Sequence, residues 1–163
     1  MASQESRIPS TPCLLDRLTD SEPGVKTEPA LRLSELNSQL KHALCRDLAA
    51  LLNTRRAEED FDPAYRESTH SVLTFGVADF TSSNLTNEID RSRLRLSIER
   101  AIRQFETRLT GVTVTMEEPD LIRPTLTFQV TAMLRTGTAS GPMLFDITVH
   151  RDSRRVAVAG ATS

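Results

Sequence analysis

The sequence is poor in aromatic residues and in lysine. Its 163 residues include no tryptophan and a single tyrosine, and aromatic residues make up 4% of the chain. Aliphatic side chains must therefore build the hydrophobic core, and the stacked aromatic rings that usually line a sugar cleft are not expected. Lys26 and Lys41 are the only lysines, so arginine carries nearly all of the positive charge. Codon usage can explain this bias, and so can a need for bidentate arginine–carboxylate pairing in an interface.

Long apolar runs, cysteine motifs and a strong net charge are also absent. No stretch approaches the roughly 18 uninterrupted apolar residues of a membrane-spanning helix, and residues 1–12 lack the apolar segment of a signal peptide. Cys13 and Cys45 have no CxxC or histidine spacing and are expected to be reduced thiols. The net charge of −2 gives no general attraction to nucleic acid or to an anionic membrane. The sequence therefore predicts a cytoplasmic protein without direct membrane insertion.

No motif for a metal, a cofactor or a nucleophile is present. His42, His70 and His150 lie far apart without metal-ligand spacing, and the six glycines form no phosphate-binding loop. No GxSxG sequence occurs, and no serine or cysteine can be placed beside a histidine. We therefore expect no catalytic residue, no cofactor-binding or metal-binding residue, and no small-molecule substrate.

Paired carboxylates leave one enzymatic alternative, a muralytic glycosidase of the lysozyme-like kind. Such an enzyme needs only two acidic side chains about 5 to 10 Å apart. Three pairs have suitable spacing: Glu88 with Asp90, Glu99 with Glu106, and Glu117 with Glu118. Neighbouring arginines explain Glu99 more simply, because Arg95 and Arg103 lie four residues before and after it on a predicted helix.

Two segments have the hydrophobic spacing of amphipathic helices. In residues 30–54, leucines recur every three or four residues. In residues 92–109, an apolar stripe is flanked by arginines, and Gly111 is expected to end the helix. Acidic residues are interleaved with those arginines, which favours a solvated or protein-binding face over nucleic-acid binding. Residues 71–80 are apolar but have neither period, and we expect a buried, irregular connection there.

After the second helix the hydrophobic period becomes two, as in strands with one buried and one solvated face. Four such runs follow, at residues 112–116, 126–134, 143–149 and 156–158. The predicted fold class is α+β: a two-layer domain in which two long helices pack on one face of a four-stranded, mostly antiparallel sheet. Residues 1–12 are expected to be a flexible tail, and residues 13–163 a single domain.

A charged pair at the end of the second helix suggests a protein-binding role. Glu106 and Arg108 lie where the helix gives way to the first strand. Side chains two residues apart do not face each other on a helix. If the helix unwinds there, each charge is expected to be available to an outside partner, with Arg103 in support. Ordinary surface charge at a helix end is the alternative.

The last strand suggests a second binding role. Val156, Ala157 and Val158 form a short, terminal and β-prone run that follows arginines, so we expect an edge strand. The unpaired backbone groups of an edge can accept a strand from another chain. An edge that is protected by charge and pairs with nothing is the alternative.

Four segments of the chain carry motifs that occur together in one known family. They are residues 14–18 (LLDRL), 46–56 (RDLAALLNTRR), 71–80 (SVLTFGVADF) and 102–109 (IRQFETRL). In this order they resemble the phage baseplate wedge lysozyme-like family, and more specifically its TssE branch from type VI secretion. Thr107 stands where the family has the proline of a Glu-Pro-Arg motif, and Phe75 and Ala78 stand where it has Tyr and Pro.

The resemblance implies a structural, non-enzymatic role without a cofactor. Members of this family are wedge components of contractile injection machines, which bind other wedge subunits and help to seed the contractile sheath. Glu106 and Arg108 match the acidic and basic members of the Glu-Pro-Arg motif, which is thought to dock on neighbouring wedge subunits. The expected partners are baseplate wedge subunits and sheath subunits, and the expected location is a bacterial baseplate in the cytoplasm, docked at the inner membrane.

Overall fold

The computed structural model describes most of the chain from residue 33 onward. The described residues are 18, 33–56, 67, 70–80, 87–117, 125–135, 140–150 and 152–160. The predicted tail (residues 1–12) and the LLDRL segment, apart from Leu18, lie outside them. No helix in these ranges is long and apolar enough to span a membrane.

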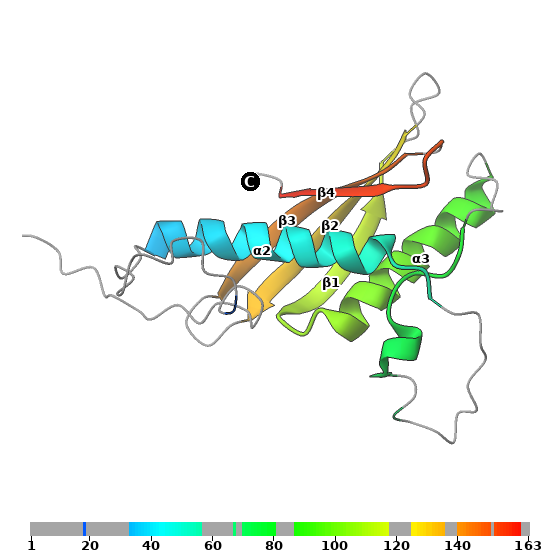
Figure 1. The fold of residues 1–163 in the computed structure, drawn as a ribbon. Coiled ribbons are helices and arrows are strands. Elements are labelled where there is room, and N and C mark those ends of the chain that lie inside the picture. Colours follow the sequence, from blue (N-terminus) through cyan, green and yellow to red (C-terminus); the bar gives the residue numbers. More distant parts are fainter. Residues whose placement is uncertain are drawn as a thin grey trace, which may run out of the picture.

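Within the described residues, two long helices and four strands make up the fold (Figure 1). The helices are α2 (Leu33–Asn53) and α3 (Glu88–Phe105), and a short 3₁₀ turn, η2 (Val72–Thr74), lies between them. The strands are β1 (Leu109–Met116), β2 (Thr125–Arg135), β3 (Ser140–His150) and β4 (Val156–Gly160). The α+β class predicted from the sequence is therefore confirmed.

The sheet is an antiparallel meander in the order β1-β2-β3-β4. On β2, residues at even positions from Leu126 to Leu134 are buried, and their neighbours across the ladder on β3 and β1 are buried or partly buried. Because side chains alternate between faces, this pattern buries one face of the sheet. That face and the leucine stripes of the helices form one hydrophobic core. Its largest fully buried side chains include Phe128, Phe145, Leu44, Leu48, Leu52, Ile98, Ile102 and Ile147.

Each helix lies against one edge strand of the sheet. α2 contacts β4, α3 contacts β1, and the two helices contact each other. In Figure 1, α2 runs in front of the strands and α3 lies beside β1. The finer prediction, a single helical layer on one face of the sheet, stays a prediction.

The second helix begins and ends four residues earlier than predicted. Asn87 caps its first turn, because the Asn87 side chain accepts the Ile89 N–H at 3.0 Å. The helix ends at Phe105, and Glu106 already has non-helical dihedral angles (φ −99°, ψ 83°). The prediction that Gly111 ends the helix is wrong. Gly111 lies inside β1 with φ +61°, at a bulge where the register with β2 shifts.

The irregular connection at residues 71–80 is held against the rest of the fold at several points. The Val77 N–H donates to the Thr54 carbonyl at 2.9 Å, and the Arg56 N–H donates to the Val77 carbonyl at 2.9 Å. Phe75 packs edge-on against Phe105, with ring centroids 5.2 Å apart. The segment is only partly buried as predicted, since Val72 is 84% exposed.

Candidate functional site: an ionic corner and two sheet edges

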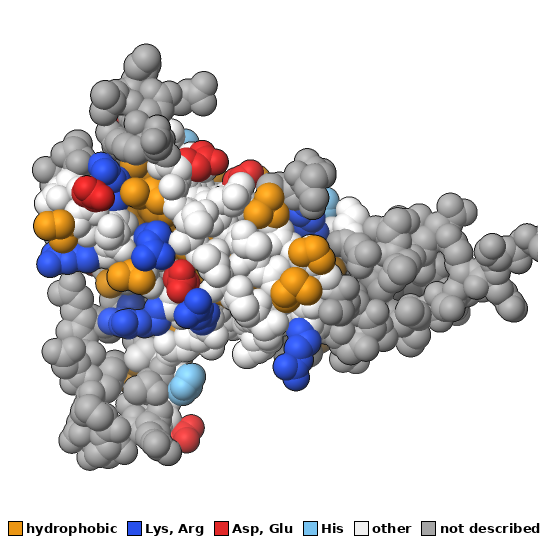
Figure 2. All heavy atoms as spheres, turned by 180° about the vertical axis from the view of Figure 1, so that it is seen from behind, with side chains coloured by type: hydrophobic (Ala, Val, Ile, Leu, Met, Phe, Trp, Pro, Cys, Tyr) orange, Lys and Arg blue, Asp and Glu red, His pale blue; other side chains and the backbone are white. Residues whose placement is uncertain are grey.

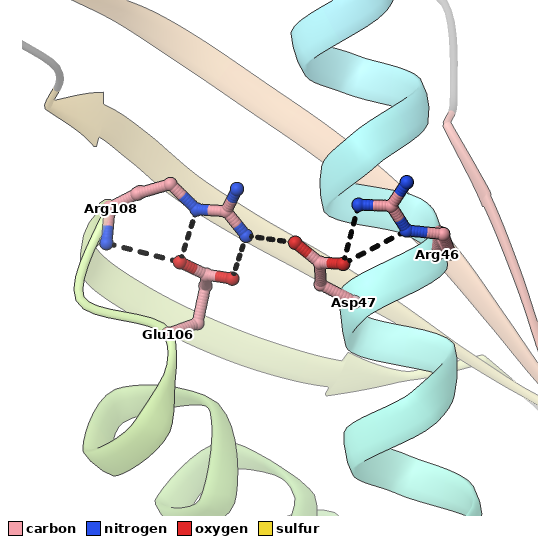
Figure 3. Close-up of polar contacts among 4 residues, drawn as sticks. All are labelled: Arg46, Asp47, Glu106 and Arg108. Atoms are coloured by element: carbon pink, nitrogen blue, oxygen red, sulfur yellow. Dashed lines mark hydrogen bonds and ion pairs between the residues drawn. The ribbon is translucent and has the colours of Figure 1, made fainter. Parts of the chain in front are cut away.

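Glu106 and Arg108 pair with each other at the turn between α3 and β1. One Glu106 carboxylate oxygen, Oε1, accepts the backbone N–H of Arg108 at 3.1 Å and its Nε–H at 2.7 Å. The other oxygen, Oε2, accepts from Nη2 of the same guanidinium. Figure 3 shows the two side chains facing each other across the turn. The bidentate geometry fixes the position of the guanidinium.

The inference that both charges are available to an outside partner is therefore wrong. It carried the helical rule that side chains two residues apart do not face each other over to the unwound backbone that it expected here. The chain leaves the helix at Glu106, so the Glu106 side chain folds over the turn and meets Arg108. Among the described residues, Glu106 is the only charged residue that is buried, with 7% of its surface exposed.

Asp47 of α2 extends this pair across the fold. Its Oδ2 atom accepts from Nη2 of Arg108 at 2.7 Å, and its Oδ1 atom accepts from Nε and Nη2 of Arg46 at 3.1 Å each. The four side chains form a chain of alternating charge that joins α2 to the α3–β1 turn (Figure 3). We call these four residues, Arg46, Asp47, Glu106 and Arg108, the ionic corner.

The electrostatics of the ionic corner keep Arg108 charged. Its hydrogen bonds to Glu106 outweigh the opposite effect of burial, and the contact with Asp47 adds to them. Together they raise the pKa of the Arg108 guanidinium further above its ordinary value. Because arginine is already protonated at any pH at which proteins fold, this shift gives no pH dependence of stability in that range.

Exposure increases along the ionic corner from one end to the other. The exposed fractions of the side chains are 9% for Glu106, 23% for Arg108, 30% for Asp47 and 45% for Arg46. A partner can therefore reach Arg46, Asp47 and part of Arg108, whereas Glu106 lies beneath them. Sequence reasoning missed Asp47 and Arg46, although both lie in the RDL sequence of a family motif.

Arg103 does not join the ionic corner. Its Nε and Nη2 atoms donate to the Val112 carbonyl at 3.0 and 2.6 Å, and Nη2 also pairs with Glu99 at 2.9 Å. Because α3 directs Arg103 toward β1, its support of Glu106 and Arg108 in binding a partner stays a prediction. The sequence contained a signal for the ion pair of Arg103 with Glu99, because the two residues are four positions apart on a predicted helix.

Side chains of α3 close the outer edge of β1. Arg95 donates to the Val114 carbonyl at 3.1 Å, Glu99 accepts the Val114 N–H at 3.1 Å, and Arg103 donates to the Val112 carbonyl. Four helical residues rise about 6 Å, and two strand residues rise about 6.6 Å. The spacing of Arg95, Glu99 and Arg103 along α3 is therefore close to the spacing of the outward backbone groups of β1. At Val112 and Val114 these side chains block the addition of another strand.

The outer edge of β4 is only partly closed. The Asn53 side chain at the end of α2 accepts the Val156 N–H at 3.0 Å and donates to the Val156 carbonyl at 2.8 Å. The hydrogen bond from the His150 N–H to the Arg155 carbonyl sets the alternation of this ladder. By that alternation Ala157 bonds to β3, while the backbone groups of Val158 point outward. Among the described residues they have no hydrogen-bond partner.

The carboxylates considered for a glycosidase have different neighbours in the structure. Glu99 is held by Arg95, Arg103 and the Val114 N–H, whereas Glu106 is held by Arg108. Asp90 pairs with Arg93 at 3.6 Å. Glu88 and Glu117 are exposed, and Glu118 lies outside the described residues. Within the described ranges, His, Cys, Asp and Glu form no group that could hold a metal ion.

Comparison with known proteins connects these features to one family. The family model for baseplate wedge protein gp25 matches residues 38–139. The match includes the whole ionic corner and the α3 residues that bond to β1, and it ends before β3 and β4. No curated protein matches the sequence.

Proposed function

The chain belongs to the family of baseplate wedge protein gp25, and from this premise we propose that it is a TssE-type structural subunit of a type VI secretion baseplate. In this role it binds other wedge subunits and helps to seed the contractile sheath, and it transforms no substrate. The proposed location is the bacterial cytoplasm, in a baseplate docked at the inner membrane. The ionic corner is the observation that carries the proposal.

The corner suits docking because a buried acid orients a partly exposed base. Glu106 engages Nε and Nη2 of Arg108, and Asp47 also accepts from Nη2. Among the described residues, Nη1 of Arg108 has no hydrogen-bond partner. A guanidinium that is already fixed loses little side-chain entropy on binding. We propose that Nη1 donates to an acceptor on a helical element of a wedge subunit, where the last carbonyl groups of a helix attract a cation.

Neutralising the pair tests this docking role. In the double variant Glu106→Gln/Arg108→Gln, the two amides can still hydrogen-bond, but the fixed guanidinium is gone. We expect the folded variant to bind the wedge subunits at least 30-fold more weakly, equivalent to about 2 kcal/mol or more. The measurement is co-purification with the wedge subunits, followed by titration.

Arg155→Ala is the matched control, because Arg155 is an exposed arginine directly before β4, and its hydrogen bonds do not involve the corner. It is expected to bind the wedge subunits as the wild type does. Wild-type affinity of the folded double variant would contradict docking through the ionic corner.

The partly open edge of β4 supports the second element of the proposal, contact with a sheath subunit. Because α3 side chains occupy the backbone groups of Val112 and Val114 in β1, we propose β4 as the edge for strand addition. The available site is short, because Asn53 occupies the backbone groups of Val156 and the Lys41 side chain lies over Gly160. We propose that the end of the Lys41 side chain moves aside when a strand pairs at Val158 and beyond.

A pair of proline substitutions separates edge pairing from folding. Val158→Pro removes an N–H that points outward, so the sheet is expected to stay intact. Ala157→Pro removes an N–H that bonds to β3, and we expect it to unfold β4. If the edge seeds the sheath, Val158→Pro should assemble the wedge normally but reduce sheath polymerisation at least tenfold. Normal sheath polymerisation in this variant would contradict the β4 role and leave wedge docking intact.

A further inference from the structure

A groove separate from the ionic corner lies between α3 and the segment 74–78. Its volume is about 230 Å³. One side is a single stripe of α3 that contains Leu96, Ser97, Arg100 and Gln104, and the other side is formed by the segment and by Arg56. None of the four residues of the ionic corner lines it.

Small residues shape the groove, and contacts between α3 and the segment 74–78 hold its two sides in place. Gly76, Ala78 and Ala101 are among its lining residues, so a partner can approach the backbone closely. The Ala78 N–H donates to the Ser97 hydroxyl at 3.4 Å, which ties the segment to α3. At the other end, the edge-on contact of Phe75 and Phe105 fixes the segment again.

The charged residues that line the groove, among those described, are all basic. Among its described lining residues are three arginines, Arg56, Arg93 and Arg100, and no acidic residue. Arg93 makes a long contact of 3.6 Å with Asp90, and its side chain is 78% exposed. Within the described part of the chain, the side chains of Arg56 and Arg100 make no ion pair or hydrogen bond. In Figure 2, basic and hydrophobic side chains, with acidic ones among them, gather on the side of the molecule where α3 lies.

An exposed leucine lies between the basic residues of α3. Leu96 is 52% exposed, which is unusual for a leucine beside a groove with apolar lining residues such as Phe105 and Ala101. Arg93, Leu96 and Arg100 have the spacing i, i+3 and i+7, so they lie along one face of the helix. The two arginines are about 10.5 Å apart along the helix axis.

From this pattern we infer that the groove binds an acidic amphipathic helix of a protein partner. Two carboxylates seven residues apart on that helix pair with Arg93 and Arg100, and Arg56 contacts the same charges from across the groove. An apolar side chain between the carboxylates packs on Leu96 and the small residues. The apolar lining favours a protein helix over a phosphate or a nucleic acid, which would leave Leu96 uncovered.

The test uses a synthetic probe and site-resolved detection. The probe is a capped, alanine-based helical peptide with two glutamates seven residues apart and a leucine four residues after the first. A matched peptide carries glutamine in place of both glutamates. Binding to the full chain is followed by NMR through the backbone amides of Gly76, Ala78, Ser97 and Ala101. We expect saturable shifts at these amides and binding of the glutamine peptide at least tenfold weaker.

Arginine variants then locate the binding site. Arg93→Ala and Arg100→Ala lie on an exposed helix face and are expected to keep the fold, with affinity about threefold lower in each case. Arg135→Ala should bind the probe like the wild type. Because this groove is distinct from the ionic corner, Glu106→Gln/Arg108→Gln should also bind it normally, so the two proposals can fail independently.

Three outcomes would overturn the inference. One is the absence of shifts at the four amides at millimolar peptide. The second is equal binding of the glutamate and glutamine peptides. The third is saturation of the same amides by inorganic phosphate or by a single-stranded oligonucleotide when the peptide gives none, which would identify a general anion site.

Discussion

Replacing Glu106 with alanine is expected to lower the free energy of unfolding by about 3 kcal/mol, because it leaves the partly buried Arg108 with one carboxylate in place of two. Glu106 accepts three hydrogen bonds from Arg108, including the backbone N–H that shapes the turn into β1. The substitution therefore removes both a charge partner and a turn contact. Chemical denaturation measures the effect, with the wild type and the variant fitted to the same dependence of the unfolding free energy on denaturant concentration.

Glu117→Ala is the control for this experiment. Glu117 is an exposed glutamate directly after β1, and its replacement should change stability by no more than about 0.5 kcal/mol. A similarly small effect of Glu106→Ala would mean that the pairing of Glu106 with Arg108 does not stabilise the α3–β1 turn. A double-mutant cycle with Arg108→Ala then measures the interaction energy between the Glu106 and Arg108 side chains.

Gly76→Ala is expected to destabilise the protein by about 3 kcal/mol or more, because it combines backbone strain with a backbone clash. Gly76 has φ +110°, a conformation that side chains other than glycine rarely adopt. An added Cβ would also lie 2.9 Å from the carbonyl carbon of Thr54 and closer still to its oxygen. The clash breaks the contact between the end of α2 and Val77, and thermal or chemical denaturation measures the loss.

Two other glycines provide a graded comparison. Gly111 has φ +61° but nothing within 4 Å of an added Cβ, so Gly111→Ala should cost only about 1 kcal/mol. Gly141 has open space and no positive φ, so Gly141→Ala should change stability by about 0.5 kcal/mol or less. Equal effects at Gly76 and Gly111 would show that the clash with Thr54 is relieved by movement of the segment.

Hydrophobic periodicity predicted the elements of the fold but not their ends. It identified both helices and all four strands, because a buried stripe requires a regular period. It placed Leu109 on the second helix, since a residue buried by the following strand continues the same stripe. The position of Gly111 was misread for a related reason: a glycine with positive φ occurs at bulges as well as at helix ends.

The candidate site could be predicted only where its signal was local. Glu106 and Arg108 were found from the sequence, and the family resemblance that contains them is confirmed. Their pairing was not, because it depends on the chain leaving the helix at Glu106. The contacts of Asp47 with Arg108 and of Asn53 with Val156 join residues 61 and 103 positions apart. Such contacts leave no periodic signal in a single sequence.

A density map of the assembled wedge, at a resolution that shows side chains, tests the central claim most directly. That claim is that the protein functions by being held through its ionic corner and its β4 edge. The map should place a helical element of a neighbouring subunit against Arg108, with an acceptor on Nη1 and with Glu106 still paired beneath it. In the sheath-bound baseplate, a foreign strand should pair at Val158. A map in which the ionic corner faces solvent and other surfaces make all the subunit contacts would contradict the account.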